Sequence, residues 1–319
     1  MSSAACAPGR LDLPLGAMVG TKGPPEVSPL TLHPMLPQAA RAPAGASHAG
    51  GAADSPARVG PFLSCRPGSF GPAEADAYRY LAEWGVRYVE IPLPAPEHTA
   101  AELASLAAHG LRCGSLQVAF DVEEPGMLQR IAESARRASQ EFGCRYLFTS
   151  VHTGPQGTEQ AYGLLRRAGD AVAPHGVTLL LETHPDLGTN GAVTAETMRA
   201  IAHPQVRANW DPANVFFYNE NTDALAECAQ AVPFIGGMHL KDCGGGYQRW
   251  DFGTLGQGVV PFPALLHLLL QNGFQGPCTM EIEGVAGEQL TPAQHVDRVR
   301  ASVAYLRGLG YFPSQPSLV

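Results

Sequence analysis

The sequence predicts an α/β protein built as a closed (β/α)8 barrel, known as a TIM barrel. From about residue 58 to residue 310, eight strand-like runs alternate with eight helix-like runs, which is typical of parallel strands joined by helical crossovers. A span of roughly 250 residues is the usual length of such a barrel. Hydrophobic residues make up 45% of the 319-residue chain, which is enough to fill its core.

The predicted strands are short apolar runs bounded by turn residues. They cover residues 61–65, 86–93, 111–119, 144–151, 177–183, 206–211, 234–240 and 278–283. The predicted helices carry apolar residues at helical spacing and cover residues 73–84, 99–109, 125–142, 159–174, 194–202, 222–231, 263–272 and 291–309. Expected helix-starting caps are Thr99, Thr194, Thr222 and Thr291, and expected helix-ending glycines are Gly110, Gly143 and Gly273.

The N-terminal segment differs in composition from the rest of the chain. Ala, Gly, Pro and Ser supply 33 of residues 1–56, and aromatic residues are absent there. Such a segment cannot bury enough apolar area to offset the entropy lost on ordering. We therefore expect a disordered extension over residues 1–56, a barrel domain over residues 57–312 and a short tail over residues 313–319.

Charge and cysteine content narrow the class of function. The net charge of −8 disfavours a nucleic-acid partner, which requires clustered Lys and Arg. The seven cysteines are scattered without a CxxC pair, which favours a reducing compartment. Neither a membrane-spanning run nor a secretory signal is recognised. The composition thus predicts a cytoplasmic protein with a small-molecule partner and no membrane or nucleic-acid partner, and leaves a homo-oligomer open.

Four strand-like runs end on side chains that can bind a metal ion. The runs are LLLETH (179–184), NWDPAN (209–214), GMHLKD (237–242) and CTMEIEG (278–284). The side chains are Glu182, Asp211, His239 and Glu281, separated by 29, 28 and 42 residues. These separations equal about one strand–helix repeat or a repeat with a longer loop. Because parallel strands of a barrel end at the same face, the four side chains are expected to converge there.

The alternation of side chains along each strand supports this expectation. Glu182 and His184 share one face of their strand and leucines share the other. His239 and Lys241 likewise oppose Met238 and Leu240. The same parity in the other two runs directs apolar residues to the helices and polar residues to the barrel mouth.

Three carboxylates and one imidazole favour Mn²⁺ or Mg²⁺, and Co²⁺ or Zn²⁺ are also compatible. Glu182 and Glu281 come from the fifth and eighth strands, so they are expected to flank a bound molecule. A metal-stabilised enediolate between them would allow one glutamate to remove a proton and the other to return one. The outcome would be epimerisation or aldose–ketose isomerisation, and loss of a hydroxyl would give dehydration.

Residues 58–310 resemble the sugar phosphate isomerase/epimerase family, the xylose isomerase-like TIM barrels. The resemblance is carried by the four metal-capable motifs and by LGQGVVPF (255–262), which is similar to the family's glycine loop before the last helix. It implies that Glu182, Asp211, His239 and Glu281 bind a divalent metal and that the two glutamates are the acid–base pair. The chain departs from the family at Asn214, where many members carry a histidine.

Further polar residues at the strand ends are candidate substrate contacts: His184, Asn214, Lys241 and His152. Glu90 at the end of the second strand is interpreted as structural. Glu283 shares the parity of Glu281 and is an alternative ligand, and Trp250 in a glycine-rich loop is a candidate cover for the site.

The leading hypothesis is therefore a metal-dependent isomerase or epimerase of a small sugar or polyol. The alternative is a metal-dependent dehydratase of a keto-inositol or related cyclic keto-acid, which begins with the same proton abstraction. A DNA-repair endonuclease on the same barrel is disfavoured because histidines for a zinc cluster are missing, and a non-catalytic sugar-binding barrel is a further alternative. Neither GxGxxG nor a P-loop is present, so no nicotinamide or ATP is expected.

Overall fold

The structure is a computed structural model that describes residues 60–312. The expected extension over residues 1–56 and the tail over residues 313–319 lie outside the described residues. None of the helices between residues 60 and 312 combines the length and apolar character that a bilayer crossing requires.

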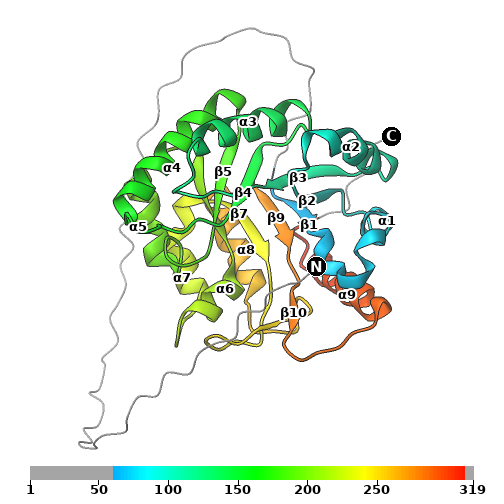
Figure 1. The fold of residues 1–319 in the computed structure, drawn as a ribbon. Coiled ribbons are helices and arrows are strands. Elements are labelled where there is room, and N and C mark those ends of the chain that lie inside the picture. Colours follow the sequence, from blue (N-terminus) through cyan, green and yellow to red (C-terminus); the bar gives the residue numbers. More distant parts are fainter. Residues whose placement is uncertain (1–59, 313–319) are drawn as a thin grey trace, which may run out of the picture. The chain divides into compact units, whose positions relative to one another are not determined.

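Eight parallel strands within residues 60–312 close into a barrel, in the order β1-β2-β3-β4-β5-β6-β7-β9 (Figure 1). The barrel strands are β1 (Phe62–Cys65), β2 (Tyr88–Pro92), β3 (Arg112–Gln117), β4 (Tyr146–Thr149), β5 (Thr178–Glu182), β6 (Val206–Trp210), β7 (Ile235–Leu240) and β9 (Pro277–Met280). The barrel closes where β1 pairs with β9, from Phe62 opposite Pro277 to Cys65 opposite Met280. The predicted fold class and all eight predicted strands are confirmed.

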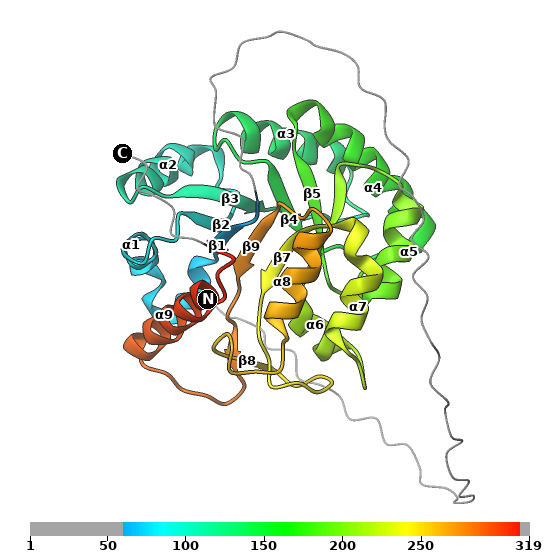
Figure 2. The same ribbon diagram turned by 180° about the vertical axis from the view of Figure 1, so that it is seen from behind.

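Helices surround the strands on the outside of the barrel (Figures 1 and 2). They are α1 (Ala77–Glu83), α2 (Thr99–Ala108), α3 (Met127–Gln140), α4 (Thr158–Val172), α5 (Gly191–Ile201), α6 (Pro212–Tyr218), α7 (Ala224–Ala231), α8 (Phe262–Gln271) and α9 (Pro292–Gly308), with 3-10 turns η1 (Pro67–Asp76), η2 (Pro96–His98), η3 (Ala173–His175) and η4 (Val232–Phe234). All eight predicted helices are confirmed. The short α6 was not predicted, because its seven residues are too few to show a helical period.

The helix ends agree in part with the predicted caps. Thr291 caps α9 and forms a capping box with Gln294. The other three predicted caps were wrong: Thr99, Thr194 and Thr222. Asn190 caps α5 and Asp223 caps α7, because their carboxamide and carboxylate oxygens accept backbone N–H groups of the first turn. The predicted glycines after α2, α3 and α8 adopt left-handed conformations, as expected.

The main hydrophobic core lies between the strands and the helices. Trp210 of β6 pairs with Met238 of β7, which in turn pairs with Cys278 of β9, and all three are fully buried. The intervening residues face the inside of the barrel, where His239 lies opposite Thr279. The predicted parity is therefore confirmed for these strands: apolar side chains face the helices and polar side chains face inward.

Two irregularities align polar side chains inside the barrel. Pairing between β2 and β3 shifts by one residue at Gly114, so that Glu90 lies opposite Ser115. Pairing between β6 and β7 shifts at Gly236, so that Asn209 lies opposite Gly237. A bulge re-aims the side chains that follow it. At the end of the barrel where β7 and β9 stop, β8 (Asp251–Phe252) pairs antiparallel with β10 (Gly284–Val285) (Figures 1 and 2).

Candidate metal centre

The four predicted ligands occupy equivalent positions on four strands. Glu182 is the last residue of β5, and His239 is the penultimate residue of β7. Asp211 directly follows β6 and Glu281 directly follows β9. Their position at the C-terminal ends of barrel strands is the usual location of catalytic groups in this fold.

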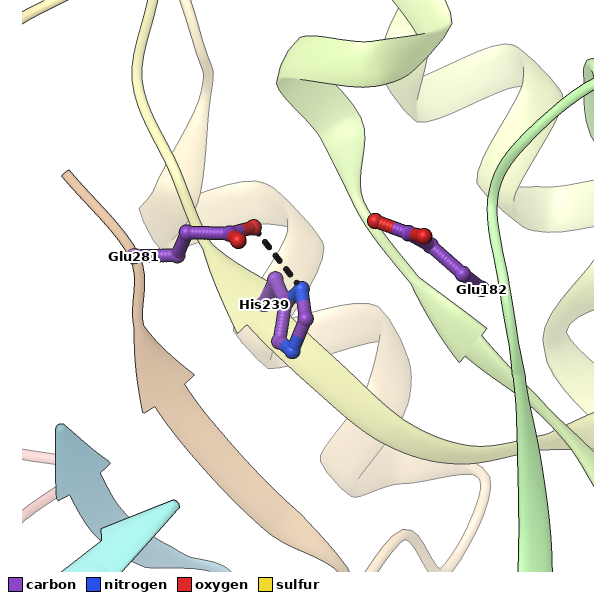
Figure 3. Close-up of side chains that lie close together, drawn as sticks. All are labelled: Glu182, His239 and Glu281. Atoms are coloured by element: carbon purple, nitrogen blue, oxygen red, sulfur yellow. Dashed lines mark ion pairs between the residues drawn. The ribbon is translucent and has the colours of Figure 1, made fainter. Parts of the chain in front are cut away.

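The ligand atoms of three of the four predicted residues lie close together. Glu182, His239 and Glu281 each offer an atom within 4.8 Å of the other two. The carboxylates of Glu182 and Glu281 approach the imidazole from opposite sides (Figure 3). His239 Nδ1 lies 3.0 Å from Glu281 Oε2 and 3.9 Å from Asp211 Oδ2. The structure thus gathers the predicted ligand set, with Asp211 at its edge.

Two buried atoms in this group lack a hydrogen-bond partner among residues 60–312. They are His239 Nδ1 and Asp211 Oδ2. The other oxygen of Asp211 accepts the backbone N–H groups of Ala213 and Asn214 at 2.9 and 3.0 Å, at the start of α6. An unpartnered buried polar atom costs about 1–3 kcal/mol. An imidazole nitrogen and a carboxylate oxygen are both suitable ligand atoms for a divalent cation, so the residues present fit such an ion.

The charge balance around the imidazole also favours a cation. The neighbouring charged side chains are Glu90, Glu182, Asp211, Glu281 and Glu283 against Arg66 and Lys241. With His239 neutral, this group carries three excess negative charges. Burial raises the pKa of Asp211, although Lys241 and His239 oppose the rise. A divalent cation would offset the excess charge and favour the ionised carboxylates.

Arg66 is a residue of the site that the sequence analysis missed. It directly follows β1 and lines the centre, with Nε 2.6 Å from Glu90 Oε1 and Nη1 paired with Glu281 Oε1. Its guanidinium lies 4.8 Å from the centre of the Phe148 ring. The signal was available, because Arg66 is a polar residue at the end of a predicted strand, like the four ligands.

Glu90, interpreted from the sequence as a structural residue, is buried in contact with a predicted metal ligand. Its side chain is 1% exposed, and Oε1 is 3.1 Å from His239 Nε2. Burial alone would raise the pKa of Glu90, but Arg66, His239 and the Ser115 hydroxyl together hold the pKa well below its usual range. Glu90 is therefore an ionised carboxylate in direct contact with a predicted ligand.

Lys241 lies inside the same cluster. Its ammonium is 3.5 Å from Glu281 Oε2 and 3.7 Å from Asp211 Oδ2, and it pairs with Glu283. It also donates to Asn214 Oδ1 at 3.2 Å. Asn214 is itself 4% exposed. The roles of Lys241 and Asn214 as substrate contacts stay predictions, and both side chains are already engaged with predicted ligands or their neighbours.

The other side of the centre carries aromatic and imidazole groups. The Ser150 hydroxyl donates to Glu182. The ring of His184 lies 4.8 Å from that of His152 and 5.1 Å from that of Tyr218. Burial raises the pKa of Tyr218 to about 12, and the charges of Glu182 and Asp211 add to the rise. His152 and His184 are thus next to each other near Glu182, and their contact with a substrate stays a prediction.

A cavity of about 370 Å³ opens beside Glu281. Arg66, Glu283 and Trp250 are among the residues that line it. Trp250 is 46% exposed and packs edge-on against Phe252 of β8. The volume falls within the range of about 300–1,000 Å³ that is usual for small-molecule sites.

Solved structures with the same fold have several different activities in their names. The probable 3-DHS dehydratase AsbF from Bacillus anthracis has a TM-score of 0.61 at 17% identity, covering 77% of this chain and 98% of that one. A D-allulose 3-epimerase from Methylomonas sp., in complex with D-allulose, has a TM-score of 0.61 at 20% identity, covering 79% and 98%. A xylose isomerase-like TIM barrel protein from Mycobacterium smegmatis, in complex with magnesium, has a TM-score of 0.62 at 16% identity, covering 78% and 97%. Similarities at this level of identity establish the fold alone.

Sequence comparison identifies the family more directly. No curated protein sequence matches the chain. The sequence model of one family, described as xylose isomerase-like TIM barrel, matches residues 78–309, well over half of the chain. The chain therefore belongs to the xylose isomerase-like TIM barrel family.

Proposed function

We propose that this protein is a divalent-metal-dependent isomerase or epimerase of a small sugar or polyol. One observation carries the proposal: Glu182 and Glu281 face each other across His239, whose Nδ1 has no hydrogen-bond partner among the described residues. Two carboxylates on opposite sides of one position suit proton removal on one face and proton return on the other. The family membership and the epimerase among the similar structures support the same class of reaction.

The ligands in this proposal are Glu182, Asp211, His239 and Glu281, with Mn²⁺ as the preferred ion and Mg²⁺, Co²⁺ or Zn²⁺ as alternatives. When bound, the ion would supply positive charge that stabilises an oxyanion developing on the substrate. The magnesium in the name of the Mycobacterium smegmatis structure agrees with a divalent ion in this family.

The side chains divide the chemistry between them. In one direction, Glu182 would remove the proton from the carbon beside the substrate carbonyl. Glu281, once it has taken up a proton from solvent, would return that proton to the opposite face or to the neighbouring carbon, and Glu182 would release its proton to solvent. Arg66 and Lys241 contact Glu281 and would hold its carboxylate in place during this transfer. The cavity beside Glu281 would receive the part of the substrate that does not react.

A dehydratase is the second candidate, and the similarity to the AsbF structure favours it. Both reactions start with proton abstraction next to a carbonyl, so the same residues would serve. The dehydratase would then expel a hydroxyl from a keto-inositol or cyclic keto-acid instead of returning a proton.

The test begins with metal analysis of the purified protein, followed by incubation of the Mn²⁺-loaded protein with ketoses and keto-inositols in D₂O. The isomerase proposal predicts deuterium uptake at the carbon beside the carbonyl, whereas water loss with a new enol or enone chromophore indicates the dehydratase. Glu182→Gln and Glu281→Gln should each lower turnover by about 10²–10⁴-fold while the metal stays bound at saturating concentration. Exposed Glu196 on α5 offers a control, since Glu196→Gln should leave turnover unchanged. Unchanged turnover in both site variants would refute the mechanism.

A further inference from the structure

We propose that Glu90 is a positioning residue of the metal centre, which accepts the Nε2–H of His239 and thereby leaves the Nδ1 lone pair available for the cation. The inference rests on the metal dependence proposed above. It assigns a role in ligand assembly to a residue of β2, a strand that supplies none of the predicted ligands.

Glu90 is held in a fixed orientation from both neighbouring strands. Arg66, after β1, donates its Nε to Oε1 at 2.6 Å. Ser115 of β3 donates its hydroxyl to Oε2. The shift in pairing at Gly114 is what brings Ser115 opposite Glu90. With both oxygens anchored, Oε1 faces His239 Nε2 at 3.1 Å across the inside of the barrel.

The surroundings of the imidazole select one tautomer. A neutral imidazole has one N–H group, and the nitrogen without it has a lone pair. A proton on Nδ1 would find no acceptor in hydrogen-bond geometry among residues 60–312, although Glu281 Oε2 lies 3.0 Å away, whereas a proton on Nε2 points at Glu90 Oε1. Arg66 Nη2 lies 3.5 Å from Nε2, at the outer limit of a hydrogen bond, so it competes only weakly with Glu90 for this nitrogen.

A proton on Nε2 satisfies Glu90 and leaves Nδ1 bare. Nδ1 then faces Glu281 Oε2 and Asp211 Oδ2 at 3.0 and 3.9 Å, and it has no hydrogen-bond partner among residues 60–312. This is the arrangement that a metal-binding histidine requires, with one nitrogen for the ion and the other held by a carboxylate.

Arg66 extends the same support to a second ligand. Its guanidinium is planar and rigid, and it contacts Glu90 through Nε and Glu281 through Nη1. The position of Glu90 is therefore linked to that of Glu281 as well as to that of His239. Loss of Glu90 should loosen two ligands at once, although Glu90 itself does not reach the reacting atoms.

The test compares Mn²⁺ affinity across matched variants by isothermal titration calorimetry. Glu90→Ala should weaken binding by about 10–100-fold, as expected for the loss of a carboxylate behind a metal-binding histidine. Glu90→Gln should weaken it less, because the amide oxygen still accepts the Nε2–H. Glu102→Gln provides the control: Glu102, on α2, accepts a hydrogen bond from Tyr78 outside the barrel, and its loss should leave Mn²⁺ affinity unchanged.

Long-range ¹H–¹⁵N spectra of histidine-labelled protein report which nitrogen of His239 carries the proton. That tautomer would not depend on Glu90 if Glu90 only stabilised the fold. In the metal-free wild type, where no ion excludes a proton from Nδ1, the His239 signals, identified by their loss in His239→Gln, should show protonation at Nε2. The wild-type spectrum decides the question even if Glu90→Ala does not fold. Protonation at Nδ1, or an Mn²⁺ dissociation constant within twofold of wild type in a folded Glu90→Ala, overturns the inference. Failure of the wild type to bind any metal would instead refute the proposed function.

Discussion

The buried carboxylate of Asp242 organises the loop between β7 and α8. It is 1% exposed and lies two residues after the end of β7. Its Oδ1 accepts the N–H groups of Cys243 and Val260 at 2.9 and 3.2 Å, and its Oδ2 accepts those of Gly256 and Gly258 at 2.8 and 2.9 Å. The loop before α8 is thus tied to β7 by three bonds to a single side chain.

Asp242→Asn is nearly the same size and removes one acceptor oxygen. Whichever way the amide is oriented, its NH₂ group faces two of the four N–H groups and leaves them without an acceptor. Gly256 and Gly258 are exposed, so the NH₂ group should turn toward their N–H groups, where water can replace part of each lost bond. An unsatisfied buried N–H costs about 1–3 kcal/mol, so the free energy of unfolding should fall by about 2 kcal/mol for these two partly buried groups together. Urea unfolding at pH 7 in EDTA measures the change, with an unchanged m-value as evidence that the same transition is followed.

Asp223→Asn provides a matched control. Asp223 caps α7, is exposed and uses a single oxygen to accept the N–H groups of Leu225 and Ala226. The amide oxygen of asparagine can take over both bonds, and asparagine is an equally good cap, so the loss should stay below about 0.5 kcal/mol. If Asp242→Asn lost less than about 1 kcal/mol, the reasoning from unsatisfied amides would be wrong.

Three further predictions concern other buried groups. Lys241→Met removes a cation beside Glu281 and Asp211, so the metal-free protein should lose about 3–5 kcal/mol of stability while its affinity for Mn²⁺ rises. Calorimetric melting in EDTA measures the stability and Mn²⁺ titration measures the affinity. A metal-free variant as stable as the metal-free wild type would contradict the prediction. Burial raises the pKa of the Cys228 thiol to about 12, so its contribution to stability is complete below the unfolded-state pKa of about 8.5 and is lost as pH rises toward 12. Between pH 8 and pH 10, Cys228→Ala should therefore lose about 2 kcal/mol less stability than wild type in urea titrations, and parallel pH curves would contradict the prediction. Asn190→Ala should lower the free energy of unfolding in urea by about 1 kcal/mol or more, because the Asn190 side chain accepts the Val193 N–H at the start of α5 and donates to Asn219. If Asn190→Ala lost less stability than Thr194→Ser, Asn190 would not be the cap of α5.

Local pattern was enough to predict most of the fold. Strands such as β5 and β7 are recognisable because apolar side chains alternate with polar ones, and that alternation also determines which side chains face inward. Helix boundaries were less predictable: Thr194 was predicted to be a cap, but it lies inside α5, which begins after Asn190, whose side chain accepts the Val193 N–H. The short α6 lacked a period long enough to recognise.

The sequence by itself determined the barrel and the four side chains that converge on one point, because strand ends and strand parity are local properties of the chain. Only the tertiary structure revealed that Arg66 and Glu90 are bound to those side chains. Glu90 and His239 are 149 residues apart, and their contact depends on how far the barrel strands are staggered and where the bulge at Gly114 falls. Those features are set by packing across the closed sheet, which no local pattern records.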